Sequence, residues 1–270
     1  ERVMVGVSRG ASASGGPPAQ VTANAIPAVI QTFETQASVR VLLRLLQSRD
    51  NLIRRASAKS LHKLKGKNPK LNYFPKTVFR LLLQYTFEYR DIVSSRKVIK
   101  SNFNAKAYDR LPEDDQTELL QAREGLLEVL DRQLSLRIET IFQLLAVYYS
   151  RKDLDVAYKG FVSTDRDTRA NAIEFLDTLL TPNLKSTLLP IVENTTLVAS
   201  NDVSDTMLSD IPSEYTCFKR LLKGRDLKIK LAVLYLLKHL NDKRYLKLVK
   251  PLINHHHKKI RTFAIQAKDN

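Results

Sequence analysis

LQSRDNLIR, residues 46–54, is the stretch that decides the fold, because the chain contains it again in altered form. The second copy is FVSTDRDTR at 161–169, and the third is LKGRDLKIK at 222–230. Each copy has an apolar residue, a small turn residue, an aspartate, and an arginine or lysine four residues after the aspartate. A weaker fourth copy runs from Ile253 through His257 to Arg261. A helix-turn-helix signature that recurs along a chain predicts stacked helical hairpins.

The charged residues of the repeat are predicted to have structural roles. An aspartate in the turn can accept hydrogen bonds from the first free backbone N–H groups of the next helix, and its charge faces the positive end of the helix dipole. A basic residue four positions later lies one turn away, where it can pair with an aspartate of the same or the adjacent repeat. The predicted N-caps are Asp50, Asp165 and Asp226, and the basic residues of the ladder are Arg54, Arg169, Lys230 and Arg261.

Composition agrees with an all-α protein, an α-solenoid of stacked antiparallel helix pairs. The chain has 270 residues, of which 43% are hydrophobic, and it has no tryptophan, which suits helix stacking better than a sandwich or barrel. Glycine and proline interrupt the first residues, so we expect a flexible lead-in at 1–24 and the solenoid at 25–270. The lone Cys217 excludes an internal disulfide and is interpreted as a small core residue.

Apolar periodicity and proline positions predict where the helices lie. Residues 195–210 are rich in Ser, Thr, Asn and Asp and are predicted to form a mobile loop. The predicted helices are 25–34, 38–48, 51–65, 75–99, 115–149, 153–162, 166–180, 184–193, 213–223, 226–240, 243–253 and 257–268.

Two segments depart from the short-hairpin rhythm. Residues 116–149 carry a broad apolar stripe, and residues 73–98 carry a matching one. Each stripe needs a partner, so we expect the two to pack as a long antiparallel pair. The aromatic cluster of Tyr85, Phe87 and Tyr89 is interpreted as core packing in preference to a binding surface.

One part of the chain resembles a known family. The residues that carry the likeness are Ile141–Leu145, Tyr158–Phe161, Arg169–Leu180 and Leu188–Pro190. They resemble the HEAT-repeat extension of bacterial membrane proteins related to ADP/ATP translocases. The resemblance implies a HEAT/armadillo-like solenoid attached to a major-facilitator-type transporter portion, at the cytoplasmic side of a bacterial inner membrane. The transporter's substrate-binding residues would lie in the membrane portion, so none is carried over.

Basic residues gather in two segments of the chain. Residues 40–70 contain ten lysines and arginines against one aspartate, and residues 214–268 contain fifteen against three acidic residues. The whole chain has a net charge of +16, so the remaining residues are mildly acidic. Such a distribution favours phosphate-bearing partners, namely nucleic acid, anionic lipid head groups or nucleotides, without choosing among them.

Three functions fit these features. The first is a non-catalytic scaffold or regulatory module, the cytoplasmic part of a transporter, whose basic residues could adhere to anionic lipid. The second is a nucleic-acid-binding solenoid with a basic concave groove. The third is a protein–protein adaptor. The candidate surface for an anionic partner comprises Arg54, Arg55, Lys59, Lys63, Lys219, Lys223, Lys228, Lys230, Lys258 and Lys259.

Catalytic and metal chemistry find little support in the sequence. Three consecutive histidines, 255–257, rarely converge on one metal without other ligands. His62 and His239 lack the spacing of a triad, and no Gly-rich phosphate loop occurs. Glu174 and Asp177 share a helical face, but ordinary salt bridges explain such pairs. We therefore expect no enzyme activity, no metal and no cofactor.

The two ends of the chain suggest a piece of a longer polypeptide. Residue 1 is not Met, and the sequence stops as another helix would be finishing. If a C-terminal capping repeat is missing, Ile260, Phe263 and Ile265 should be partly exposed. No apolar run reaches about 18 residues, so no transmembrane helix is expected within this piece.

Overall fold

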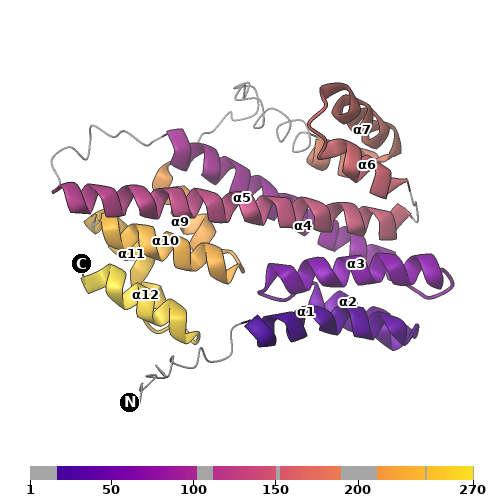
Figure 1. The fold of residues 1–270 in the computed structure, drawn as a ribbon, viewed down its shortest axis with the longest axis horizontal. Helices are drawn as coiled ribbons and strands as arrows, with labels where there is room; N and C mark the ends of the chain where they lie inside the picture. The colour runs from indigo at the N-terminus through magenta and orange to yellow at the C-terminus, as the bar shows by residue number, and fades with distance from the viewer. Residues whose placement is uncertain (1–16, 102–111, 150–152, 190–211, 241, 270) are drawn as a thin grey trace, which may run out of the picture.

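A computed structural model of the chain describes residues 17–101, 112–149, 153–189, 212–240 and 242–269. Every regular element in these ranges is helical, so the protein is all-α, as predicted (Figure 1). Residues 182–189 are also helical. The other α-helices are α1 (Pro17–Thr32), α2 (Gln36–Leu45), α3 (Asn51–Lys67), α4 (Pro75–Ser101), α5 (Glu113–Tyr149), α6 (Leu154–Phe161), α7 (Arg166–Leu179), α9 (Glu214–Lys223), α10 (Leu227–Leu240), α11 (Leu246–Val249) and α12 (Lys258–Asp269).

Helices α4 and α5 form the long antiparallel pair that the two apolar stripes predict. Figure 1 shows α1–α3 beside one half of this pair and α9–α12 beside the other half. Both α3 and α10 pack against α5, although more than a hundred residues of chain separate them. The pair is therefore the element that holds the two ends of the chain together.

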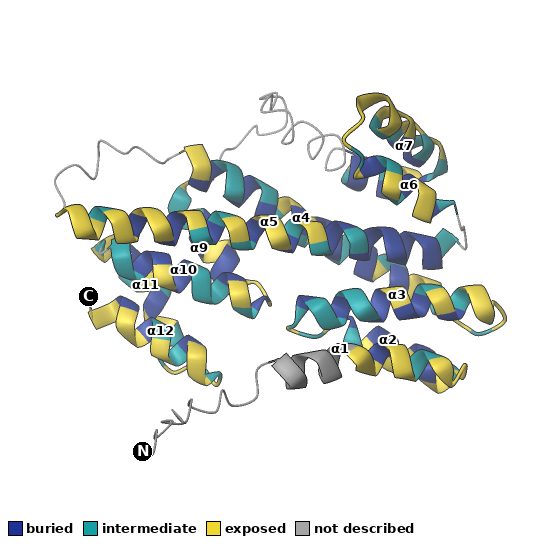
Figure 2. Cartoon of the chain, viewed as in Figure 1, coloured by how far each residue is buried: buried dark blue, intermediate teal, exposed yellow. Residues whose placement is uncertain are grey.

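The core is divided into two apolar clusters along α4 and α5. One cluster joins α2, α3, α6 and α7 to the C-terminal half of α5, and the other joins α9, α10 and α12 to its N-terminal half. Figure 2 shows α5 largely buried toward its C-terminal end, where residues 140–147 are all buried, whereas α7 and α12 have broad exposed faces. Polar contacts between α3 and α10 connect the two clusters, as described below.

The repeated turns have one common geometry. Asp50 accepts a hydrogen bond from Leu52 N (2.8 Å), Asp165 from Thr168 N (2.7 Å) and Asp226 from Lys228 N (3.0 Å), so all three predicted N-caps are present. The basic residue that follows was predicted to pair with an aspartate of the same or the adjacent repeat. Arg54 lies 3.6 Å from Asp226 of another copy, and it also bonds to its own turn.

In three of the four turns, an arginine six residues after the start of the turn bonds back to it. Arg54 Nη1 donates to Ser48 O (2.7 Å), Arg169 Nη1 to Ser163 O (2.8 Å) and Arg261 Nη1 to His255 O (3.0 Å). These donors give a partner to a backbone carbonyl of the turn, beyond the end of the preceding helix. Among the four copies, only the third has lysine at this position, Lys230.

Two predicted boundaries are wrong for reasons that involve proline. The lead-in was expected to extend to residue 24, but α1 begins at Pro17, because a helix tolerates proline in its first turn, where the N–H needs no partner. The helix expected at 243–253 is divided into two 3₁₀ turns (Lys243–Tyr245 and Lys250–Leu252) around α11. Pro251 cannot donate to the carbonyl four residues before it, so a regular α-helix cannot continue there. The predicted loop at 195–210 lies outside the described residues.

Several predictions about burial can now be compared with the structure. Cys217, Tyr85 and Tyr89 are buried as predicted, whereas Phe87 is exposed. Ile260 is buried under α10, so its predicted exposure is wrong, while Ile265 is exposed. No helix in the described part of the chain is both long enough and apolar enough to span a membrane.

Loss of the Asp50 cap should weaken α3 measurably. Replacing Asp50 by alanine leaves the Leu52 N–H without its acceptor, so we expect the free energy of unfolding to fall by about 1 kcal/mol. Asp50→Asn keeps an acceptor at this place and should cost roughly a few tenths of that. Urea denaturation of both variants measures the difference; equal losses would show that the cap hydrogen bond is not the cause.

Candidate functional site

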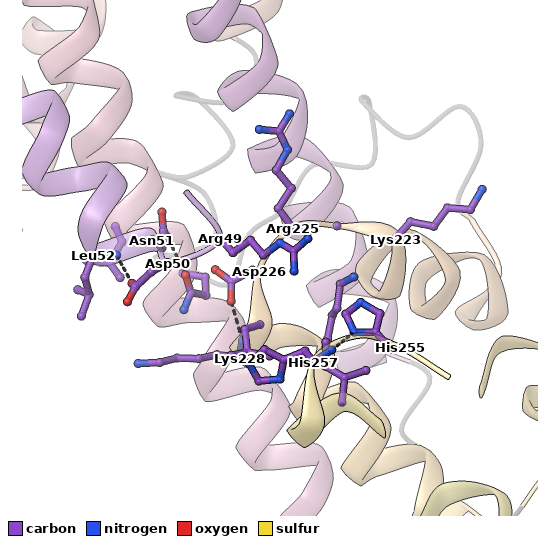
Figure 3. Close-up of a pocket in the computed structure, with 16 residues that line it drawn as sticks. Arg49, Asp50, Asn51, Leu52, Lys223, Arg225, Asp226, Lys228, His255 and His257 are labelled. Carbon is purple, nitrogen blue, oxygen red and sulfur yellow. Dashed lines mark hydrogen bonds between the residues drawn. The ribbon is translucent and has the colours of Figure 1, made fainter. Parts of the chain in front are cut away.

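A cleft of about 420 Å³ opens where three of the four repeated turns meet (Figure 3). Its walls come from the turn before α3, the turn before α10 and the turn before α12, and α5 provides the remaining wall. Gln133 of α5 is buried and accepts a hydrogen bond from Asn51 (2.6 Å), so the cleft ends against α5. The lining residues are Arg49, Asp50, Asn51, Leu52, Gln133, Leu136, Lys223, Gly224, Arg225, Asp226, Leu227, Lys228, Lys230, His255, His257 and Ile260.

The lining carries an excess of positive charge. Its cationic side chains are Arg49, Lys223, Arg225, Lys228 and Lys230, and its acidic side chains are Asp50 and Asp226. Both carboxylates already accept backbone hydrogen bonds as N-caps. The first residues of α3 and α10 also line the cleft, so the positive ends of two helix dipoles add to the charge. The chemistry favoured by this lining is the binding of an anion.

Behind the lining lies a buried ion-pair network. Arg54 is 1% exposed and Arg137 is 2% exposed, and both face Asp226, which is 3% exposed. The distance from Arg54 Nη2 to Asp226 Oδ2 is 3.6 Å, and that from Arg137 Nη1 is 3.9 Å. Glu88, 3.6 Å from Arg137 Nη2, is only partly buried. Burial, followed by the charge of Arg54, lowers the pKa of Arg137.

The turn before α12 contributes three neighbouring histidines. His255 Nδ1 accepts a hydrogen bond from His257 N (3.1 Å), and Arg49 Nη1 bonds to His256 Nε2. Both ring nitrogens act as acceptors, so they carry no proton in this arrangement. Burial, and then the charges of His256, Lys230 and Arg49, lowers the pKa of His255. Burial and Arg49 likewise lower the pKa of Lys230. The cations of this cleft therefore repel one another, as they would at an anion site without its anion.

The structure separates the predicted anionic-partner residues into two groups. Lys223, Lys228 and Lys230 lie together in the cleft, and exposed Lys258 and Lys259 lie at the start of α12. The remaining exposed lysines are elsewhere: Lys219 on α9, and Lys59 and Lys63 on α3. Lys59 and Lys63 are eight and twelve residues after Asn51, which places them about 12 and 18 Å along the helix.

Two arginines of the predicted surface have other roles. The prediction that Arg54 faces a groove is wrong, because its guanidinium is buried between Ser48 O, Asn51 and Asp226. Arg55 is partly exposed and its Nε pairs with Glu139 (2.5 Å). Only part of the predicted surface is therefore available to a partner.

Sequence reasoning missed Arg49 and Arg225 as cleft residues. Each directly precedes a capping aspartate, so the dipeptide Arg-Asp at 49–50 and 225–226 was a usable signal. Arg225 Nη1 donates to Gln47 Oε1 (2.7 Å), across from the third repeat to the first. No sequence pattern predicts that these turns meet in one cleft, because their meeting depends on how α3 and α10 pack on α5.

The other polar candidates have ordinary partners. His62 Nδ1 bonds to Gln143 Oε1 (2.8 Å), and His239 Nδ1 lies 3.1 Å from Glu118. Asp177 pairs with Lys185 (2.6 Å). Among the described residues, no group of three or more His, Cys, Asp or Glu side chains is placed to hold a metal ion.

Comparisons with known proteins add no assignment. No family model matches the chain, and neither the curated proteins nor the solved structures include a match. The resemblance to the HEAT-repeat extension of nucleotide translocases therefore stays a prediction.

The charge of Asp226 should contribute far more to the free energy of unfolding than the charge of Asp50. Asp226→Asn keeps a cap for α10 but leaves Arg54 and Arg137 buried without their shared counter-charge, so we expect a loss of about 3 to 5 kcal/mol in the free energy of unfolding. Asp50→Asn is the matched control at the same cleft and should cost roughly a few tenths. Chemical denaturation that found equal losses would mean that the buried network is not held by this charge.

Acid should destabilise the protein partly through His255. Its folded-state pKa lies below the ordinary value, so as pH falls through about 6.5 the unfolded chain binds the proton first and stability decreases. His255→Ser places the residue of the first two copies here, which keeps an acceptor for His257 N and removes the titration. We expect a smaller fall in melting temperature between neutral and mildly acidic pH; an unchanged fall would contradict this role.

Proposed function

We propose that the protein is a non-catalytic helical scaffold or regulatory module that holds a phosphate-bearing ligand in the basic cleft. The observation that supports this most strongly is the convergence of three turns, with five cationic side chains, on one cavity. Both carboxylates of the lining are already engaged as helix caps, so they do not neutralise the cations fully. A cavity of this volume also lies in the range of small-molecule sites.

We infer that the helical pairs are HEAT/armadillo-like units of an α-solenoid. The shared turn geometry supports this inference, because Arg54, Arg169 and Arg261 each bond to the carbonyl six residues earlier. A repeated local solution is what repeat architectures use.

We propose a nucleotide transporter as the context of this module, at the cytoplasmic side of a bacterial inner membrane. Two observations support the idea: the likeness of residues 141–190 to the HEAT-repeat extension, and a cleft whose chemistry suits the phosphates of a nucleotide. Basic residues outside the cleft, such as Lys59 and Lys63, would then face anionic head groups or solvent.

A charge reversal inside the cleft tests this function. Lys228 is exposed, lines the cleft and donates its backbone N–H to Asp226, so Lys228→Glu changes the lining without removing a buried side chain. We expect ATP to bind the wild-type chain and to bind Lys228→Glu roughly tenfold more weakly, since one charge-assisted contact is worth about 1.5 kcal/mol or more. Fluorescence or calorimetric titration at neutral pH measures the affinity.

The matched control is Lys63→Glu, an exposed lysine on α3 with the same change of charge. Its affinity for ATP should stay close to that of the wild type. Equal weakening by both variants, or no binding of ATP by the wild type, would overturn the proposal. Binding to duplex DNA and to phosphatidylserine vesicles is measured in parallel. If either binds more strongly than ATP, in a salt-sensitive way that Lys228→Glu does not change, the binding site is a larger basic surface and not the cleft.

A further inference from the structure

The fourth repeated turn differs from the others at the capping position. Asp50, Asp165 and Asp226 cap the helices that follow them, but the equivalent residue before α12 is His257. The rest of this turn is conventional, because His255 Nδ1 accepts from His257 N as Ser48 Oγ accepts from Asp50 N. Arg261 bonds back to the turn as the other arginines do. Only the carboxylate of the cap is replaced.

This replacement leaves the start of α12 without an anion. Within the described residues, the backbone N–H groups of Lys259 and Ile260 have no hydrogen-bond acceptor. These are the positions that Lys228 and Ile229 occupy in α10, where both N–H groups donate to Asp226 Oδ1. Free N–H groups and the helix dipole together attract an anion.

The start of α12 faces the basic cleft. His255, His257 and Ile260 all line it (Figure 3). His257 Nδ1 is buried there and has no hydrogen-bond partner in the described part of the chain. A buried polar atom without a partner is uncommon in folded proteins, and at a cavity wall it points to a ligand.

The buried network supplies a second, independent indication. Arg54 and Arg137 bring two positive charges next to Asp226, and Arg54 Nη2 and Arg137 Nη1 make no hydrogen bond in the described residues, only long ion pairs. Asp226 itself lines the cleft. Asp226 and Glu88 together balance the charge of the two arginines, so what the network leaves behind the cleft wall is buried guanidinium N–H groups without a hydrogen-bond acceptor.

We propose that the start of α12 is a subsite for the terminal phosphate of a small organic phosphate, a phosphomonoester or diphosphate. This rests on the proposed function, and it assigns a place and an orientation to the ligand. Phosphate oxygens accept hydrogen bonds from the N–H groups of Lys259 and Ile260, in the place that an aspartate carboxylate takes in the other copies. The phosphate thus supplies the cap that the chain lacks.

The cleft also explains why a terminal group fits better than a continuous phosphodiester chain. Its volume of about 420 Å³ is that of a small-molecule site, not of a groove that follows a polymer backbone. Leu52 and Leu136 provide apolar wall for the organic part of the ligand. A terminal phosphate carries close to two negative charges at neutral pH, which suits a lining with five cations.

His257→Asp tests the subsite by restoring the cap of the other copies. The new carboxylate should occupy the N–H groups of Lys259 and Ile260, so helix α12 keeps or gains stability while the ligand loses its place. We expect pyrophosphate, measured by calorimetry at low salt, to bind the wild type and to bind His257→Asp at least roughly tenfold more weakly. Unfolding is monitored alongside, since a binding loss with normal stability excludes misfolding as the cause.

The matched control is Thr35→Asp, which adds the same charge at the N-cap of another helix. Thr35 caps α2 at the end away from the cleft, ten residues or about 15 Å before the turn that carries Arg49. Its affinity for pyrophosphate should stay close to that of the wild type. Equal weakening in both variants would mean a non-specific effect of charge and would overturn the subsite.

Amide chemical shifts of the wild-type protein provide a readout that needs no variant. Pyrophosphate should shift the Lys259 and Ile260 amide signals by more than those of Leu52 and Thr168, whose N–H groups already have aspartate acceptors. If ATP and pyrophosphate bind the wild type and His257→Asp equally, the subsite is wrong but the cleft function stands. If the wild type binds neither, the proposed function itself fails.

Discussion

The buried carboxylate of Asp226 is the interaction on which the arrangement of the molecule depends. It caps α10 through two backbone N–H groups, and it is the one carboxylate in the described residues that lies within ion-pair distance of both Arg54 and Arg137. These three residues come from α3, α5 and the turn before α10, so the carboxylate holds together the two apolar clusters of the core. Buried ion pairs add little net stability compared with apolar contacts, but they tolerate few alternative geometries. The network therefore fixes how the two ends of the chain meet on α5.

That meeting explains why a basic cleft exists at this place. The first and third repeated turns each carry an arginine directly before the capping aspartate, Arg49 and Arg225. When the first and third turns approach through Arg54 and Asp226, their aspartates are used as caps and their cations are left around the cavity. The fourth turn is brought in because α12 packs on α10. The cleft is basic because the aspartates of these turns are used as helix N-caps, whereas the neighbouring cationic side chains line the cavity.

The sequence predicts the local part of this picture well and the long-range part poorly. Helix α3, from Asn51 to Lys67, and the caps of α3, α7 and α10 follow from short-range hydrogen bonding and apolar periodicity, so they could be read from the repeat. Arg54 and Arg169 have the same local sequence role, yet only Arg54 lies within an ion-pair distance of Asp226. No local pattern distinguishes them, because the difference arises from what packs opposite each turn.

The repeated turns differ in the side chain that caps the positive end of the following helix. Asp165 is exposed, and its hydrogen bonds to Thr168 lower its pKa, so it acts as an ordinary surface cap. Asp226 is buried and shares its charge with two arginines. His257 gives no carboxylate at all, although Arg261 and His255 preserve the turn around it. An N-cap stabilises a protein by about 1 kcal/mol. The turn before α12 keeps the geometry of the other turns but lacks this contribution to the free energy of unfolding. Departures of this kind from an otherwise consistent pattern are expected where a site has a task other than folding.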